Sequence, residues 1–166
     1  MKRLLAIALP IILLTSCTTD GGEPASTPQG DQSASATGLP QVTGELGAAP
    51  SLGAPSGAAP TQLVIEDVVT GDGAAAALES SVTVHYTLMA WSTGQIVESS
   101  WDGGQPVTFG LNQVILGWQQ GIPGMKVGGR RLLVIPPDLG YGAGGAGSIG
   151  PNETLIFVVD LIDVAK

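Results

Sequence analysis

A run of nine residues in the middle of the chain, Ser81–Met89, alternates between two kinds of side chain. Val82, Val84, Tyr86 and Leu88 fall on one face, and the mostly polar residues between them fall on the other. A period of two is the repeat of a β-strand, because successive side chains point to opposite sides. This run therefore predicts a half-buried antiparallel strand and excludes an amphipathic helix at this point.

The rest of the second half of the chain supplies short strands and one short helix. The expected further strands are Gln95–Ser100, Pro106–Leu111, Arg130–Ile135 and Thr154–Val164. The last of these lacks Gly and Pro, which suits an interior strand. Val114–Gly121 places apolar residues at helical spacing. Residues 61–166 are therefore expected to form an α+β domain, a curved antiparallel β-sheet wrapped around one short helix.

The segment before this domain, residues 18–60, has a different composition. It consists mainly of Gly, Ala, Pro, Ser and Thr, without a basic residue, an aromatic residue or a hydrophobic period. Such a segment buries too little apolar surface to offset an ordering cost of about 1–2 kcal/mol per residue. We expect residues 18–60 to be a disordered linker.

Residues 1–17 resemble the signal peptide of bacterial lipoproteins. Lys2 and Arg3 precede an apolar run, Leu4–Leu14, that is too short to span a bilayer of about 30 Å. The run ends in Leu-Thr-Ser-Cys, which is similar to a lipobox, and Cys17 is the only cysteine of the chain. The resemblance implies that Cys17 is lipidated and anchors the protein to a bacterial membrane outside the cytoplasm. An ordinary secretory signal with an incidental cysteine is the alternative.

Charge and composition exclude several classes of function. The chain has 14 acidic and 6 basic residues, a formal net charge of −8, and no Lys/Arg cluster. Nucleic-acid binding rests on neutralising phosphates, so it is not expected. A single histidine and a single cysteine cannot supply a metal site of the usual His/Cys type. A site made of carboxylates alone remains open, but no calcium-loop spacing of the Asp-x-Asp-x-Asp-Gly kind occurs, and neither a metal nor a cofactor is expected.

A series of motifs follows in one order across nearly all of residues 61–166. They are Val84–Thr87 (Val-His-Tyr-Thr), Val97–Ser100 (Val-Glu-Ser-Ser), Val114–Trp118 (Val-Ile-Leu-Gly-Trp), Met125–Gly128, Ile135–Gly142 and Ile149–Phe157. The series resembles the FKBP-type peptidyl-prolyl cis-trans isomerases. The resemblance implies a rotamase that accelerates rotation about X-Pro bonds, with proline-containing polypeptides as substrates. Macrolides such as tacrolimus or rapamycin are implied as further ligands.

The resemblance also assigns site residues. The implied catalytic residues are Tyr86, Glu98, Trp118, Tyr141 and Phe157, and the implied substrate-binding residues are Val97, Val107, Val114, Ile115 and Ile149. Trp118 would be the pocket floor, and the Ile115 N–H and the Tyr141 hydroxyl would donate to substrate carbonyls. Judged from the residues alone, Trp118, Phe157 and Tyr86 fit an ordinary core better than a pocket, and only the resemblance favours the pocket.

Three positions depart from the family pattern. Val97 and Val107 stand where the family has aromatic residues, and Glu98 stands where it has Asp. Two functions therefore remain open. The first is an isomerase acting on exported or membrane-proximal proteins, and the second is a non-catalytic binding or chaperone module with the same fold.

Three polar residues within the expected strands are interpreted structurally. His85 is expected to face solvent or a backbone partner. Of Arg130 and Arg131, one is expected to cover the sheet and the other to meet solvent.

Overall fold

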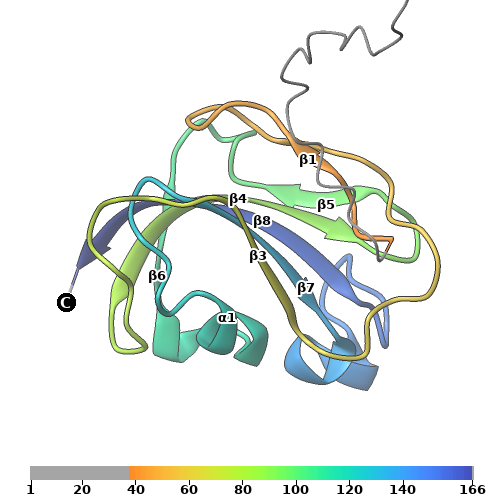
Figure 1. Ribbon diagram of the computed structural model, residues 1–166. Coiled ribbons are helices and arrows are strands. Elements are labelled where there is room, and N and C mark those ends of the chain that lie inside the picture. The colour runs from red at the N-terminus through yellow and green to blue at the C-terminus, as the bar shows by residue number, and fades with distance from the viewer. Residues whose placement is uncertain (1–37, 166) are drawn as a thin grey trace, which may run out of the picture. The chain divides into compact units, whose positions relative to one another are not determined.

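A computed structural model describes residues 38–165 as a curved antiparallel sheet with one short helix beneath it (Figure 1). The strand order is β3-β7-β8-β4-β5, and β6 also pairs with β4. The strands are β3 Val64–Val69, β4 Ser81–Ala90, β5 Ile96–Ser99, β6 Val107–Gly110, β7 Arg130–Ile135 and β8 Leu155–Ala165. The helix α1 spans Leu116–Gly121. The α+β fold predicted from the sequence is confirmed.

Three single-turn 3₁₀ helices join these elements: η1 (Leu111–Gln113), η2 (Pro137–Leu139) and η3 (Gly142–Gly144). Helix α1 starts later than the sequence predicted, because Val114 and Ile115 have extended backbone angles. No helix within residues 38–165 has the length and hydrophobicity needed to cross a membrane. Residues 1–37, which include Cys17 and the predicted signal peptide, lie outside the described part of the chain.

Helix α1 lies close against the sheet because two of its residues have no side chain. A Cβ atom on Gly117 would collide with the Ile135 side chain, and one on Gly121 would lie 2.7 Å from Leu133 Cδ2. Both contacts are with β7. The two glycines therefore set the distance between helix and sheet, and with it the depth at which Trp118 lies.

The opposite face of the sheet is covered by residues 38–60, which we call the N-terminal strap. Its short strands β1 (Val42–Thr43) and β2 (Ser51–Leu52) pair antiparallel with each other. Its apolar residues pack on a second hydrophobic cluster made of Met89, Trp91, Leu132, Val134, Ile156 and Val158. The predicted linker is therefore wrong for residues 38–60, since this segment buries apolar surface that the sequence pattern did not reveal. Residues 18–37 lie outside the described part.

Arg130 fastens the strap to the sheet. Its guanidinium is fully buried and forms two hydrogen bonds with Asp160, at 2.5 and 2.7 Å. The same group donates to the backbone carbonyls of Gly44 (2.9 Å) and Ala48 (2.8 Å) in the strap. A buried guanidinium needs acceptors for all its N–H groups, and the strap supplies two of them.

Because both faces are covered, three expectations about side-chain exposure are wrong. Strand β4 alternates between partly buried and buried side chains only as far as Val84, and from there on it is buried on both faces. His85 is buried, stacks on Trp101 with ring centroids 3.8 Å apart, and bonds the Ser100 hydroxyl through Nδ1. Arg131 is buried like Arg130, pairing with Asp67 and donating to the Gly121 carbonyl.

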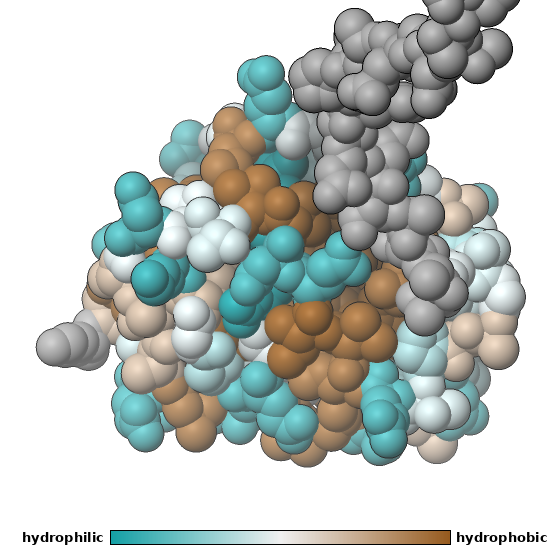
Figure 2. Space-filling view, viewed as in Figure 1, coloured by the Kyte–Doolittle hydropathy of each residue, from teal (hydrophilic) through white to brown (hydrophobic). Residues whose placement is uncertain are grey.

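Some apolar surface remains open to solvent. Figure 2 shows apolar patches separated by hydrophilic residues on the side of the molecule seen in Figure 1. Strand β3, at one edge of the sheet, contributes exposed Ile65 and Val69.

Candidate active site

A cavity of about 420 Å³ lies on the helix side of the sheet. Strands β4, β5, β6 and β8, helix α1 and the turns beside it each contribute to its wall. The lining residues are Tyr86, Leu88, Glu98, Phe109, Gln113, Val114, Ile115, Trp118, Tyr141 and Phe157. Strand register explains part of this set, because Leu88 is the cross-strand partner of both Glu98 and Phe157. Directly paired residues share a face of the sheet.

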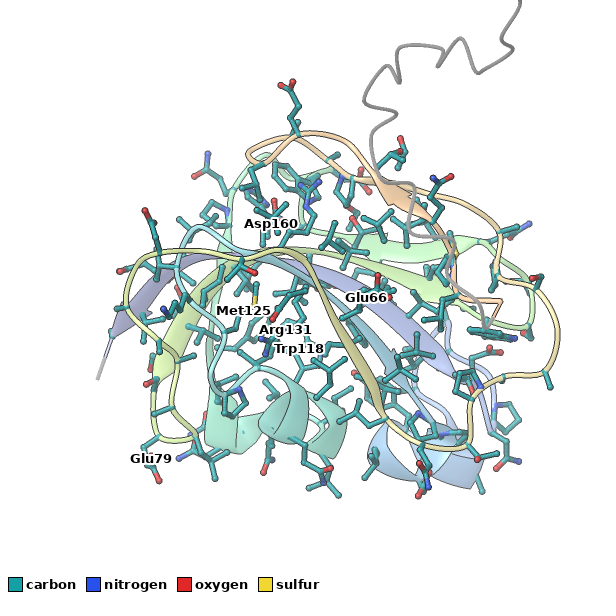
Figure 3. The ribbon with its side chains drawn as sticks, viewed as in Figure 1. Glu66, Glu79, Trp118, Met125, Arg131 and Asp160 are labelled. Atoms are coloured by element: carbon teal, nitrogen blue, oxygen red, sulfur yellow. The ribbon has the colours of Figure 1, made fainter. Side chains whose placement is uncertain are left out.

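Four aromatic rings form the deep end of the cavity around Trp118. The Trp118 ring meets those of Phe157, Phe109 and Tyr86 edge to face, with centroids 5.3, 5.6 and 5.9 Å apart. Edge-to-face contacts are a favoured arrangement of aromatic rings. Trp118 is only 4% exposed, so these neighbours hold its indole in one orientation. Figure 3 shows Trp118 on the helix side of the sheet and Asp160 on the strap side.

The indole N–H of Trp118 lies buried at the deep end of the cavity. Within residues 38–165, the indole N–H of Trp118 is the one buried side-chain polar atom without a hydrogen-bond partner. Buried polar atoms in proteins are nearly always paired with protein or water. The indole that carries this N–H contacts three aromatic rings. A group entering the deep end of the cavity therefore meets mainly aromatic surface.

At the cavity wall, the Tyr86 hydroxyl donates a hydrogen bond of 2.5 Å to Glu98 Oε1. Burial of the phenol raises the pKa of Tyr86 well above its ordinary value, and the hydrogen bond to Glu98 and the Glu98 charge raise it further. Tyr86 therefore stays protonated and remains the donor at any physiological pH. The bond holds the Glu98 carboxylate against the wall of the cavity.

Two hydrogen-bond donors near the cavity are unused. The Ile115 N–H precedes the first turn of α1 and has no acceptor among the described residues. The neighbouring carbonyl, that of Val114, accepts from the Gln119 side chain at 2.8 Å, which holds this peptide in place. The Tyr141 hydroxyl also has no partner in the described part, and Tyr141 is 41% exposed.

The structure brings together seven of the ten predicted site residues, namely Tyr86, Glu98, Val114, Ile115, Trp118, Tyr141 and Phe157. It places three others, Val97, Val107 and Ile149, outside the cavity wall. Val97 lies at a β-bulge, where the register passes from Leu88–Glu98 to Met89–Ile96, and it packs into the core. Ile149 also packs against the core, from the hairpin that it closes with Ala146. Val107, in strand β6, is 36% exposed and does not line the cavity.

Three lining residues, Leu88, Phe109 and Gln113, were not predicted. The signal for Leu88 was present, since it follows Tyr86 by two positions in a strand and so shares its face. Phe109 shares a face with Val107 in the same way. Gln113 ends a 3₁₀ turn, and no sequence pattern marks it as a site residue.

Comparison with known proteins agrees with this geometry. Residues 73–162 match the family described as FKBP-type peptidyl-prolyl cis-trans isomerase. The chain is 50% identical to a probable FK506-binding protein of Corynebacterium glutamicum, over 68% of this chain and 96% of that protein. It is also 50% identical to an FK506-binding protein of Streptomyces anulatus, over 69% of this chain and 96% of that protein.

A solved structure shows the same likeness. The crystal structure of FkpA from Escherichia coli aligns with a TM-score of 0.59 and 41% identity, over 63% of this chain and 48% of that one. The chain belongs to the FKBP-type peptidyl-prolyl cis-trans isomerase family. It is thus an enzyme of the rotamase class.

Proposed function

We propose that the cavity around Trp118 is where the chain accelerates X-Pro rotation in exported or membrane-proximal proteins. Unaided rotation takes tens to hundreds of seconds because it breaks amide resonance. The twisted amide is less dipolar than the planar one, so a dry, apolar cavity favours it over water. The observation that supports this proposal is the aromatic end of the cavity together with two unused donors, the Ile115 N–H and the Tyr141 hydroxyl. They would orient the substrate carbonyls flanking the proline.

The test is a protease-coupled proline-peptide assay on the full chain, comparing the parent with Tyr141→Phe. The variant loses only a hydroxyl at a half-exposed position, so the fold should be unaffected. A lost hydrogen bond of about 0.5–1.5 kcal/mol corresponds to a fall in kcat/KM of roughly two- to tenfold. A parent chain that binds the peptide without accelerating rotation would instead be the binding or chaperone module.

The same cavity is proposed to bind macrolides of the FK506 type. Two relatives that match this chain over nearly their whole length carry FK506 binding in their names. The aromatic floor and the apolar walls suit a ligand that is mostly hydrocarbon. Inhibition by FK506 in the assay above measures this affinity.

We propose further that the protein is a lipoprotein anchored to a bacterial membrane through Cys17. The support is the sequence of residues 1–17, with its basic start, its short apolar run and its Leu-Thr-Ser-Cys ending. Anchoring would keep the domain outside the cytoplasm, where exported chains fold. A single acyl chain gives only marginal membrane binding, so stable anchoring requires a second signal.

For the anchor, Cys17→Ser should leave the precursor uncleaved and without lipid, because the thiol is the acceptor of the diacylglyceryl group. Mass spectrometry of the N-terminal peptide of both chains measures this. A wild-type protein whose mature N-terminus lies elsewhere and is unmodified would contradict the anchor.

A further inference from the structure

The cavity wall carries a single charge. Among the described residues that line it, Glu98 is the only one with an ionisable acidic or basic side chain other than the two tyrosines. Glu98 is exposed, and its Oε1 is held by Tyr86. Its other carboxylate oxygen has no hydrogen-bond partner in the described part of the chain. A substrate entering the cavity therefore meets one fixed negative charge beside apolar walls.

The surroundings do not neutralise this charge. The whole chain carries 14 acidic and 6 basic residues. Of the basic residues within 38–165, Arg130 and Arg131 are buried in ion pairs with Asp160 and Asp67. Only Lys126 in that range is left without an ion pair, and it does not line the cavity. No basic side chain of the described residues therefore pairs with Glu98 at the cavity, and an unpaired carboxylate attracts cationic chains and repels anionic ones.

From these observations we propose that Glu98 makes the enzyme select proline segments with a lysine or arginine next to the proline. The inference rests on the proposed function of the cavity. The free oxygen of Glu98 accepts a hydrogen bond from the substrate's ammonium or guanidinium group. Because Tyr86 already holds the carboxylate, little side-chain entropy is lost when the pair forms.

The apolar wall beside Glu98 fits the remainder of such a side chain. Leu88, the cross-strand partner of Glu98, lines the same cavity. Lysine and arginine carry aliphatic stems that pack along apolar surface while the charged end stays near water. Tyr141, half-exposed and also lining the cavity, is an aromatic residue of the kind that attracts cations to its ring.

The experiment measures kcat/KM of the full chain on matched peptides by NMR exchange, which avoids the specificity of a coupling protease. The peptides carry lysine, norleucine or glutamate immediately before or immediately after the proline. Norleucine has a similar stem without the charge, so its turnover tests the proposed function itself. The kcat/KM of the lysine peptide is expected to exceed that of the norleucine peptide by about two- to fivefold at one of the two positions, which is the effect of an exposed ion pair. The kcat/KM of the glutamate peptide is expected to fall below that of the norleucine peptide. At about 1 M salt the screening length is roughly 3 Å, and the differences should shrink.

Two charge-removing variants locate the effect. Glu98→Gln keeps an acceptor for Tyr86 but should bring the lysine-to-norleucine ratio close to one. Glu79→Gln removes the same charge from an exposed residue outside the cavity wall and should leave the ratio unchanged (Glu79 is labelled in Figure 3). The proposal is overturned if the parent turns over lysine and norleucine peptides equally at both positions. It is also overturned if Glu98→Gln and Glu79→Gln lower the lysine-to-norleucine ratio by the same factor. Normal norleucine turnover in either case leaves the isomerase function standing.

Discussion

A chain shortened to residues 61–166 is expected to lose at least about 3 kcal/mol of unfolding free energy relative to residues 34–166. The shorter chain lacks the N-terminal strap, whose Leu39, Val42 and Leu52 cover the second hydrophobic cluster. Partial burial of three such side chains contributes on the order of 1 kcal/mol each. The Arg130 guanidinium would also lose the Gly44 and Ala48 carbonyls, and an unsatisfied buried donor costs about 1–3 kcal/mol.

Urea denaturation of the two chains, followed by circular dichroism, measures the difference. The chain of residues 34–166 keeps the strap and should match the full chain, so it is the control for shortening as such. A loss of this size would lower the melting temperature by about 10 °C or more. Equal denaturation midpoints for the two shortened chains would show that the strap adds nothing to the stability of the sheet.

The strap shows where prediction from the sequence reached its limit. Its hold on the sheet depends on two backbone carbonyls and a few scattered apolar residues, and neither leaves a periodic pattern. The strand on which the strap packs nevertheless carried a sequence pattern that indicated a covering layer. Thr154–Val164 reads as an almost continuous apolar run rather than an alternation, which is typical of a strand buried on both faces. Such a strand requires a second covering layer, and residues 38–60 supply it.

The candidate site, too, was predicted from the sequence only in part. The alternation in Ser81–Met89 placed Tyr86 and Leu88 on one face, whereas Trp118 was assigned as the floor only through the family resemblance. The position of Val97 could not be obtained this way, because a bulge between β4 and β5 breaks the period of two. Motif order locates a site, but local strand irregularities decide which side chains reach it.

The second large effect is expected at Trp118, as a loss of catalysis beyond any loss of fold. Trp118→Ala removes a side chain that is 4% exposed and contacts three aromatic rings, so about 3–5 kcal/mol of stability should be lost. It also removes the surface on which a proline ring would lie. Misplacement of a substrate by about 1 Å can cost a hundredfold in rate, and kcat/KM per folded molecule should fall by about that factor.

Leu111→Ala separates the two effects. Leu111 is fully buried in the same hydrophobic cluster as Trp118 but does not line the cavity. Its truncation should cost about 2–5 kcal/mol, a comparable loss of stability. Both variants are compared by kcat/KM on one proline peptide, at a temperature where circular dichroism shows them folded. Activity per folded molecule should stay near that of the parent in Leu111→Ala and collapse in Trp118→Ala. If activity in both variants merely follows the folded fraction, Trp118 is an ordinary core residue and the proline ring lies elsewhere.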